Sequence, residues 1–194
     1  NIGTTALLLP FSRQLEWLAR AAVKEGDKTP QFAFLDPLLL RTPGAAVSEC
    51  VSLTNRMGIL AQTNLLQSLE QLTSYDPGRE EKIQEGEDKL DLFEDRLSSY
   101  LVQISQHGLS MDDIHTVSRL LHAIGDFERI GDHALNIQES ARELQEKGLQ
   151  FSDAARKELE VLIAALRDTL SVTISSFKAD DPVLAQAVEP LEET

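Results

Sequence analysis

The sequence is short of several residue types, and each shortage excludes a class of protein. Its 194 residues include a single cysteine, Cys50, so no disulfide can form within the chain and a reducing compartment is favoured. Lys and Arg number 18 against 32 Asp and Glu, a net charge of −14 that argues against binding to nucleic acid or to an anionic membrane surface. No apolar run approaches the roughly 20 residues needed to span a bilayer. The 42% of hydrophobic residues can still bury a core, so we expect a folded cytosolic domain.

The hydrophobic pattern indicates helices throughout. Aromatic residues make up only 5%, and no alternation typical of β-strands is present. Apolar residues recur at three- and four-residue intervals instead, and Ser110 and Ser152 are good helix N-caps. We expect a short first helix, an extended connector over residues 26–45, and then long helices over about 46–72, from Ile83 to near His107, over about 111–147, and from the Ser152 cap to Phe177, with a fifth starting at Asp181-Pro182. The predicted fold is all-α, with long antiparallel helices joined by short loops.

A partial internal repeat divides the chain. Asp76-Pro77 recurs 105 residues later as Asp181-Pro182, and acids recur at the same offset, Glu87 with Glu192. We therefore predict one three-helix bundle over residues 46–147 and a truncated second repeat over residues 151–194. The apolar start lacks the basic front of a signal peptide, and we expect the chain to be a piece of a longer protein.

Four carboxylates stand out by their register. On the third long helix Glu128 and Asp132 fall, at about 100° per residue, within the stripe formed by Ile114, Val117, Leu121, Ile124 and Leu135, which predicts that they face the core. On the second helix Glu87, Asp91 and Glu94 lie together along the edge of the apolar stripe. Buried carboxylates are costly unless they are paired, protonated or bound to a metal.

Two interpretations of these acids stay open. The two i,i+4 pairs, Glu87 with Asp91 and Glu128 with Asp132, could form an oxygen-rich site for a divalent or trivalent cation. They could equally be neutralised by a basic residue of another helix, such as Arg56 or Arg119, and the Glu87 pair alone could lie on a solvated face. We expect Gly125 and Gly131 to let a partner backbone approach, Ile130 and Ile137 to be covered on a second side, and Cys50 to be a small core residue.

At these residues the sequence resembles a known family. The run from Phe127 to Ile137, Phe-Glu-Arg-Ile-Gly-Asp-His-Ala-Leu-Asn-Ile, is similar to the signature of PhoU-type domains. The resemblance implies three-helix bundles whose repeated Glu/Asp-x-x-x-Asp motifs bind metal clusters and take part in phosphate control. It assigns Glu87, Asp91, Glu128 and Asp132 as metal ligands, with Glu94, Asn136 and Glu192 as additional candidates, and iron, zinc, manganese, magnesium or calcium as the metal.

The N-terminal residues resemble a membrane transporter. Asn1 to Phe11 is similar to the end of the last membrane segment of bacterial sodium/phosphate cotransporters, and residues 34–43 resemble the link to their C-terminal PhoU-like domain. The resemblance implies that residues 1–45 are the end of that segment and a linker. It further implies a cytoplasmic regulatory domain of a sodium-dependent phosphate transporter at the cell membrane, whose partners are its own membrane domain and a second copy, with no nucleic acid.

Two other classes compete with this hypothesis. A free-standing PhoU-type adaptor would regulate a phosphate transport ATPase or a sensor kinase. A di-iron enzyme would need paired Glu-x-x-His motifs, and the nearest approach is the single Asp112-x-x-His115. The sequence offers no set of nucleophile, base and orienting residue, so we expect no enzyme and no catalytic residue.

Overall fold

Helices account for the regular structure of the part of the chain that can be described. The computed structural model describes residues 35–188, in which no strand occurs. The elements are η3 (Pro37–Arg41), α3 (Pro43–Gln71), α4 (Pro77–Ser105), α5 (Met111–Glu146), α6 (Asp153–Ala179) and α7 (Pro182–Ala185). The all-α prediction is confirmed. The predicted short first helix and Glu192 lie outside the described residues.

The helices begin where the sequence supplies a cap. The Ser110 hydroxyl accepts a hydrogen bond from the Asp113 amide at 3.1 Å, and the Ser152 hydroxyl accepts one from the Ala155 amide at 3.2 Å. Asp76 caps α4 by accepting from the Gly78 amide at 2.9 Å. These side chains satisfy amide groups that have no partner within the helix, which fixes where each helix starts. Both predicted serine caps are confirmed.

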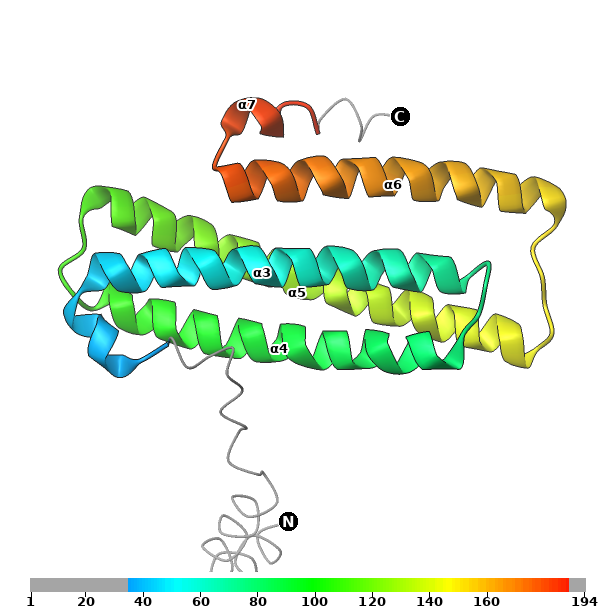
Figure 1. Cartoon of the computed structure of the whole chain (residues 1–194), viewed down its shortest axis with the longest axis horizontal. Helices are drawn as coiled ribbons and strands as arrows, with labels where there is room; N and C mark the ends of the chain where they lie inside the picture. Colours follow the sequence, from blue (N-terminus) through cyan, green and yellow to red (C-terminus); the bar gives the residue numbers. More distant parts are fainter. Residues whose placement is uncertain (1–34, 189–194) are drawn as a thin grey trace, which may run out of the picture. The chain divides into compact units, whose positions relative to one another are not determined.

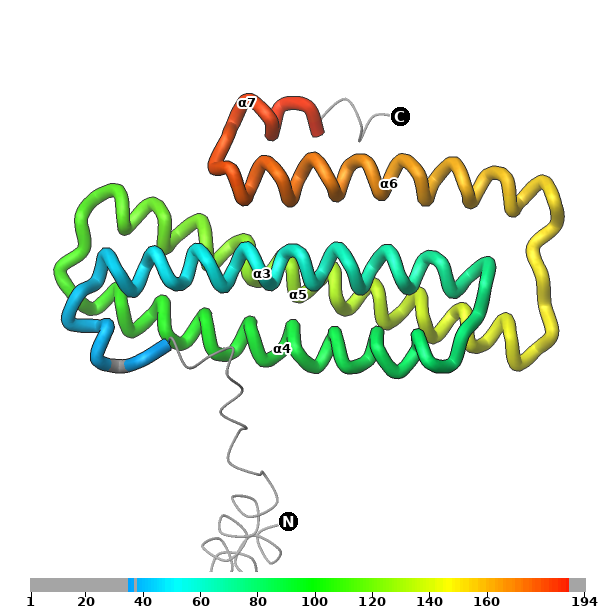
Figure 2. The backbone as a smooth tube through the Cα atoms, in the orientation of Figure 1, coloured from blue at the N-terminus to red at the C-terminus, as the bar shows by residue number. Residues whose placement is uncertain are grey.

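Three long helices form the body of the bundle. Within the unit that starts at Pro37, α3 and α5 run in the same direction. The helix between them in sequence, α4, runs in the opposite direction (Figure 1). The tube in Figure 2 shows α6 returning along α3, so that α3 is covered by α4, α5 and α6. The core is made of fully buried aliphatic residues from all three long helices, among them Leu53, Met57, Leu90, Leu97, Leu120 and Ile124.

The buried core tests the predictions made for Cys50, Ile130 and Ile137. Cys50 is fully buried, and burial raises the pKa of its thiol to about 12, so it behaves as a small core residue as predicted. Ile130 and Ile137 of α5 are partly buried against the core cluster of Leu65, Leu69 and Ala134, and Ile163, Leu166 and Leu170 of α6 pack against the same cluster.

The structure corrects several details of the predicted elements. Residues 37–41 form a 3₁₀ helix and α3 starts at Pro43, so the extended connector predicted over 26–45 is wrong from Pro37 onward. The buried stripe of α5 runs through Val117, Leu120, Ile124, Phe127, Gly131 and Ala134. Ile114 and Leu121, assigned to that stripe from the sequence, are 45% and 36% exposed. The predicted register was rotated toward the solvent, because both helix faces carry isoleucine and leucine.

The turn before α7 reproduces the turn before α4. Gln71 donates to the Asp76 carbonyl oxygen at 2.9 Å, and 105 positions later Ser176 donates to the Asp181 carbonyl oxygen at 2.8 Å. Asp181 also caps its helix, since its side chain accepts from the Val183 amide at 2.8 Å, as Asp76 does for α4. This local correspondence agrees with the proposed repeat. The domain boundaries themselves stay a prediction.

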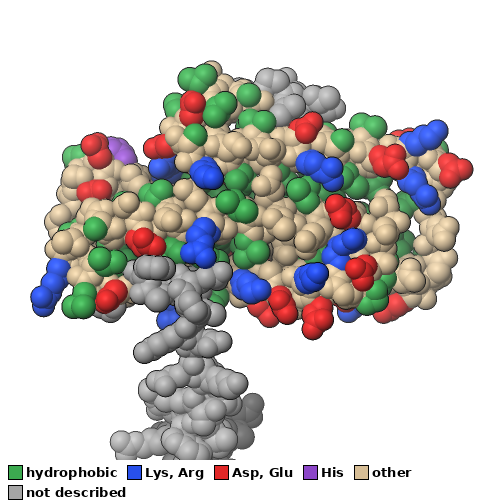
Figure 3. Space-filling view, in the orientation of Figure 1, with side chains coloured by type: hydrophobic (Ala, Val, Ile, Leu, Met, Phe, Trp, Pro, Cys, Tyr) green, Lys and Arg blue, Asp and Glu red, His purple; other side chains and the backbone are tan. Residues whose placement is uncertain are grey.

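Acidic and basic side chains are unevenly distributed over the surface. In Figure 3 carboxylates gather along the lower edge of the bundle, where Figure 1 places α4. Apolar side chains show between α3 and α6 on the same face. Among residues 35–188, no helix combines the length and the apolar character that a membrane crossing requires.

Candidate metal site on the α4–α5 face

A glycine brings α4 and α5 into close contact. A Cβ atom built on Gly131 would lie 2.6 Å from Cδ1 of Leu90, nearer than real Cβ contacts come. Leu90 is fully buried, so its side chain occupies the space that any larger residue at 131 would need. A close approach at Gly131 is therefore present, but it is made by the Leu90 side chain and not by the partner backbone that was predicted. The same prediction for Gly125 is wrong, because nothing lies within 4 Å of a Cβ at that position.

The candidate ligands flank this contact on one side. Glu87, Asp91 and Glu94 lie about 40–100° round α4 from Leu90, and Glu128 and Asp132 lie about 60–100° round α5 from Gly131. Because the two helices run in opposite directions, these rotations point to the same side of the contact. Gly86 and Phe127, which contact Asn64 and Gly58 of α3, lie on the other side. The five carboxylates, hereafter the acid cluster, therefore occupy the α4–α5 face that points away from α3.

Electrostatics shows that the two helices share this cluster. Partial burial raises the pKa of the Glu87 carboxyl to about 7, with further contributions from the negative charges of Asp91, Asp88 and, across the interface, Asp132. The pKa of Glu128 is also raised, first by burial and then by Asp132, Asp91 and Glu94. Carboxylates of each helix therefore raise the pKa of a glutamate on the other helix, so the two sets of acids lie close enough to serve one cation site.

The acids are not core residues. Glu87, Glu94 and Glu128 are half-buried, whereas Asp91, Asp132 and Asn136 are exposed. The prediction that Glu128 and Asp132 face the core is therefore wrong. It failed because Gly131, and not the acids, occupies the central position of the α5 stripe against α4.

The alternative of an ion pair between helices finds no support among the described residues. No Lys or Arg of residues 35–188 forms an ion pair with a member of the acid cluster. Arg119, one of the two basic candidates, pairs with Asp180 and lies 5.8 Å from the Phe177 ring centre. The other, Arg56, is exposed. The cluster does have uncharged partners: Gln84 donates to Glu87 at 3.1 Å and to Asp88 at 3.2 Å, and the Ser98 hydroxyl donates to Glu94 at 3.5 Å.

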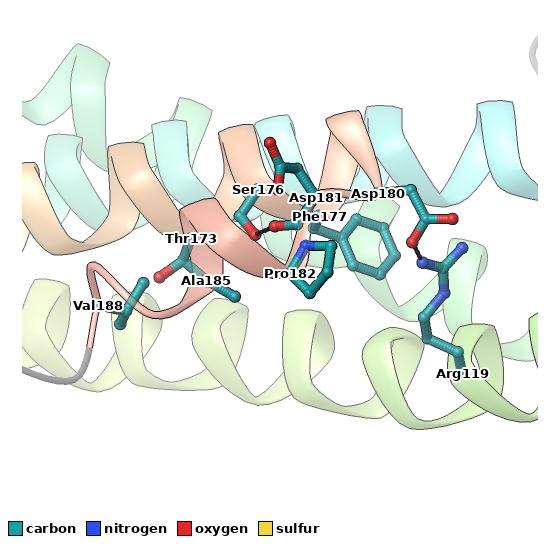
Figure 4. A pocket seen from close by; sticks show the side chains of 9 residues that line it. All are labelled: Arg119, Thr173, Ser176, Phe177, Asp180, Asp181, Pro182, Ala185 and Val188. Carbon is teal, nitrogen blue, oxygen red and sulfur yellow. Dashed lines mark hydrogen bonds and ion pairs between the residues drawn. The ribbon is translucent and has the colours of Figure 1, made fainter.

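The Arg119–Asp180 pair belongs to a separate pocket, where α6 ends and α7 begins. Figure 4 shows Arg119 reaching Asp180 at the end of α6, beside Phe177 and Pro182. This mostly apolar pocket of about 560 Å³ is lined by α5, α6 and α7. Its charged groups are already paired with each other or engaged in capping α7, so it is separate from the acid cluster.

The donor set fits a hard cation better than a soft one. Carboxylate oxygens suit Mg²⁺, Ca²⁺, Mn²⁺ and ferric iron, whereas zinc and copper sites usually include His or Cys. His133 is exposed and follows Asp132 by one position, so its side chain points away from the cluster. Among the described residues, no three of the His, Cys, Asp and Glu side chains converge closely enough to hold a metal ion as they stand. A metal would have to draw the carboxylates together by changes of side-chain rotamer.

Sequence reasoning missed one member of this surface. Asp88 contributes to the raised pKa of Glu87 through its charge and through a hydrogen bond. The sequence shows this residue in the adjacent pair Glu87-Asp88. The i,i+4 spacing that singles out the other acids does not include an adjacent residue.

Comparison with known proteins agrees with the motif. Residues 54–141 match the PhoU domain, a range that runs from α3 through α4 and most of α5. All five members of the acid cluster lie inside it. No curated protein and no solved structure gives a match. A PhoU domain indicates a phosphate-related regulatory role. Residues 54–141 are therefore a PhoU-like domain built as a helical bundle.

Proposed function

We propose that this chain is the metal-binding regulatory domain of a sodium-dependent phosphate transporter, that it lies on the cytoplasmic side of the cell membrane, and that it is not an enzyme. The observation that supports metal binding is the acid cluster. It consists of five carboxylates from two helices, without a basic partner among the described residues. The PhoU match supports the phosphate-related role. The similarity of residues 1–11 to the end of a cotransporter membrane segment supports the link to a transporter.

The regulatory mechanism follows from where the acids lie. A cation bound by Glu87 and Asp91 of α4 and by Glu128 and Asp132 of α5 would neutralise their repulsion and draw the open side of the contact together. Glu94 and Asn136 stand one turn further along their own helices, which places them at opposite ends of the site because the helices are antiparallel, and each could add a ligand at its end. Since Leu90 and Gly131 keep the two helices in contact, occupancy would change the angle between α4 and α5 about that point. The membrane domain of the same protein would read this change.

The test is phosphate uptake by cells that carry the full-length gene. The Glu128→Gln/Asp132→Asn variant removes the two α5 ligands and keeps their size. Glu139→Gln/Glu143→Gln is the matched control, because it removes two exposed acids at the same spacing on the same helix, outside the acid cluster. We expect the first variant to change how uptake depends on external phosphate, and the control to behave as wild type.

Sodium distinguishes the two forms of the proposal. If the altered uptake disappears when sodium is replaced by choline, the domain acts on a sodium-coupled transporter. If the altered uptake is independent of sodium, the free-standing adaptor of a transport ATPase or sensor kinase is the better description. Unchanged uptake in phosphate-rich and phosphate-starved cells would contradict a role of the acid cluster in phosphate control.

A further inference from the structure

A second polar site lies at the end of the bundle where α3 and α5 finish. The turn after α3, the end of α5 and the loop into α6 meet at the right-hand side of Figure 1. They enclose a cavity of about 130 Å³, hereafter the end cavity. At about 30 Å³ for each water molecule, it has room for roughly four waters, or for one tetrahedral oxyanion.

The lining of the end cavity is unusual for this chain. No Asp or Glu of residues 35–188 lines it, although the chain carries 14 more acids than bases. Arg156 does line it, from the first turns of α6, together with Gln145 and Gln150, and all three residues are exposed. These three side chains form no hydrogen bond or ion pair within residues 35–188. They are therefore free N–H donors around a cavity without a carboxylate.

Other polar groups of the lining are already engaged. Gln71 donates to the Asp76 carbonyl oxygen and to Gln138, both at 2.9 Å, and it accepts from the Asp76 amide at 2.7 Å. The Tyr75 hydroxyl donates to Glu80. These bonds hold the turn after α3 in place and leave Arg156, Gln145 and Gln150 as the adjustable part of the site.

The acids around the cavity are neutralised by other bases. Glu80 pairs with Arg142 at 3.5 Å, and Glu143 pairs with Lys147. Glu70 lies 3.9 Å from Arg79 and 3.8 Å from Arg167. Asp153, in the first turn of α6, does not line the cavity. Among the described residues, no acid forms an ion pair with Arg156, so its positive charge is available to a ligand of the cavity.

We propose that the end cavity binds a small oxyanion through Arg156, Gln145 and Gln150. Charge-assisted hydrogen bonds from a guanidinium fork and from amides suit a tetrahedral anion. The oxyanion class follows from the lining. Its identification as a phosphate group, free or on a lipid headgroup, rests on the proposed function. Such a ligand ties the start of α6 to the ends of α3 and α5, so phosphate controls how firmly α6 is held on the bundle.

The experiment titrates the purified protein with potassium phosphate at constant ionic strength and follows backbone amide NMR signals, with a chelator present to remove metal. We expect saturable shifts over residues 145–156. Arg156→Gln should weaken binding by about tenfold or more, which corresponds to roughly 1.4 kcal/mol. Lys157→Gln is the matched control, since it removes the neighbouring exposed cation that does not line the cavity, and it should bind as wild type.

Further arms separate the sources of the ligand and the two proposals. Flotation with phosphatidic acid vesicles, against phosphatidylcholine alone, tests a lipid headgroup, and an effect lost in Arg156→Gln supports the same site. No saturable response to phosphate or to phosphatidic acid vesicles, or binding that Arg156→Gln leaves unchanged, overturns the end cavity as an oxyanion site. Neither result depends on Glu128 and Asp132, so the metal-binding function would stand or fall separately.

Discussion

Gly58 and Gly131, two of the glycines that make close contacts along this bundle, have completely different surroundings. A Cβ on Gly58 of α3 would lie 2.8 Å from the Phe127 ring and 3.2 Å from Cδ1 of Ile174, so that contact is enclosed by α5 and α6. The contact of Gly131 with Leu90 is closed by α3 on one side and bordered on the other by five carboxylates. Both contacts are tight without acids at their centre. The acid cluster is therefore not needed for packing, which is the physical reason to assign it a function.

The largest effect should come from the enclosed contact. Phe127 is 5% exposed, packs on Gly58, and meets Phe177 of α6 edge to face with ring centres 5.3 Å apart. Phe127→Ala should lower the free energy of unfolding by about 3–5 kcal/mol, because it opens a cavity between three helices. Denaturant unfolding measures this. Leu121→Ala, on the same helix and 36% exposed, should cost about 0.5 kcal/mol or less. Equal losses in the two variants would contradict the assigned core.

Two glycines of one helix sharpen the comparison. Gly131→Ala gains about 1 kcal/mol of helix propensity but forces the buried Leu90 side chain to move, at a cost of about 1–3 kcal/mol, so it should be neutral or destabilising. Gly125→Ala gains the same propensity with open space around the new methyl group, and should stabilise by about 0.5–1 kcal/mol. Thermal unfolding of both variants checks the difference. Stabilisation by both substitutions would show that α4 and α5 do not meet at Gly131.

The smallest effect concerns pH. The folded protein raises the pKa of Glu87 from 4.5 to about 7, so its protonated form favours folding and that contribution is lost as the pH rises from 4.5 through 7. The side chain at position 87 of the Glu87→Gln variant cannot ionise. The melting temperature of this variant, relative to that of the wild type, should therefore rise between pH 5 and pH 8. Glu81→Gln, which removes an exposed acid of the same helix, is the control and should show no such trend. A constant difference between Glu87→Gln and wild type would contradict the charge repulsion in the acid cluster.

The sequence predicted the fold better than it predicted the site. Helix boundaries were accessible because Asp76, Ser110, Ser152 and Asp181 mark the starts of four helices by local hydrogen bonding. The two acid pairs were accessible through their i,i+4 spacing. How deeply these acids are buried could not be predicted, since a rotation of α5 by about one residue exchanges Gly131 for Asp132 at the interface. The packing of Leu90 on Gly131 and of Phe127 on Gly58 fixes that rotation.

Other features depended on contacts that no single sequence reveals. Leu162 of α6 is 54% exposed although it is apolar, because α6 lies against α3 along only part of its circumference. The end cavity gave no signal, since Gln145, Gln150 and Arg156 come from different elements and belong to no motif. The free state of Arg156 follows only from how the neighbouring acids pair.

The central claim is that the acid cluster binds a metal. The most direct measurement is the binding of manganese or ferric iron to the purified, chelator-stripped protein, by calorimetry and elemental mass spectrometry, for wild type, Glu128→Gln/Asp132→Asn and the control Glu139→Gln/Glu143→Gln. We predict near-stoichiometric binding to wild type and to the control, and a loss of affinity of about a hundredfold or more, roughly 2.7 kcal/mol, in the first variant. Equal binding by all three proteins, or no binding by any, would contradict the claim.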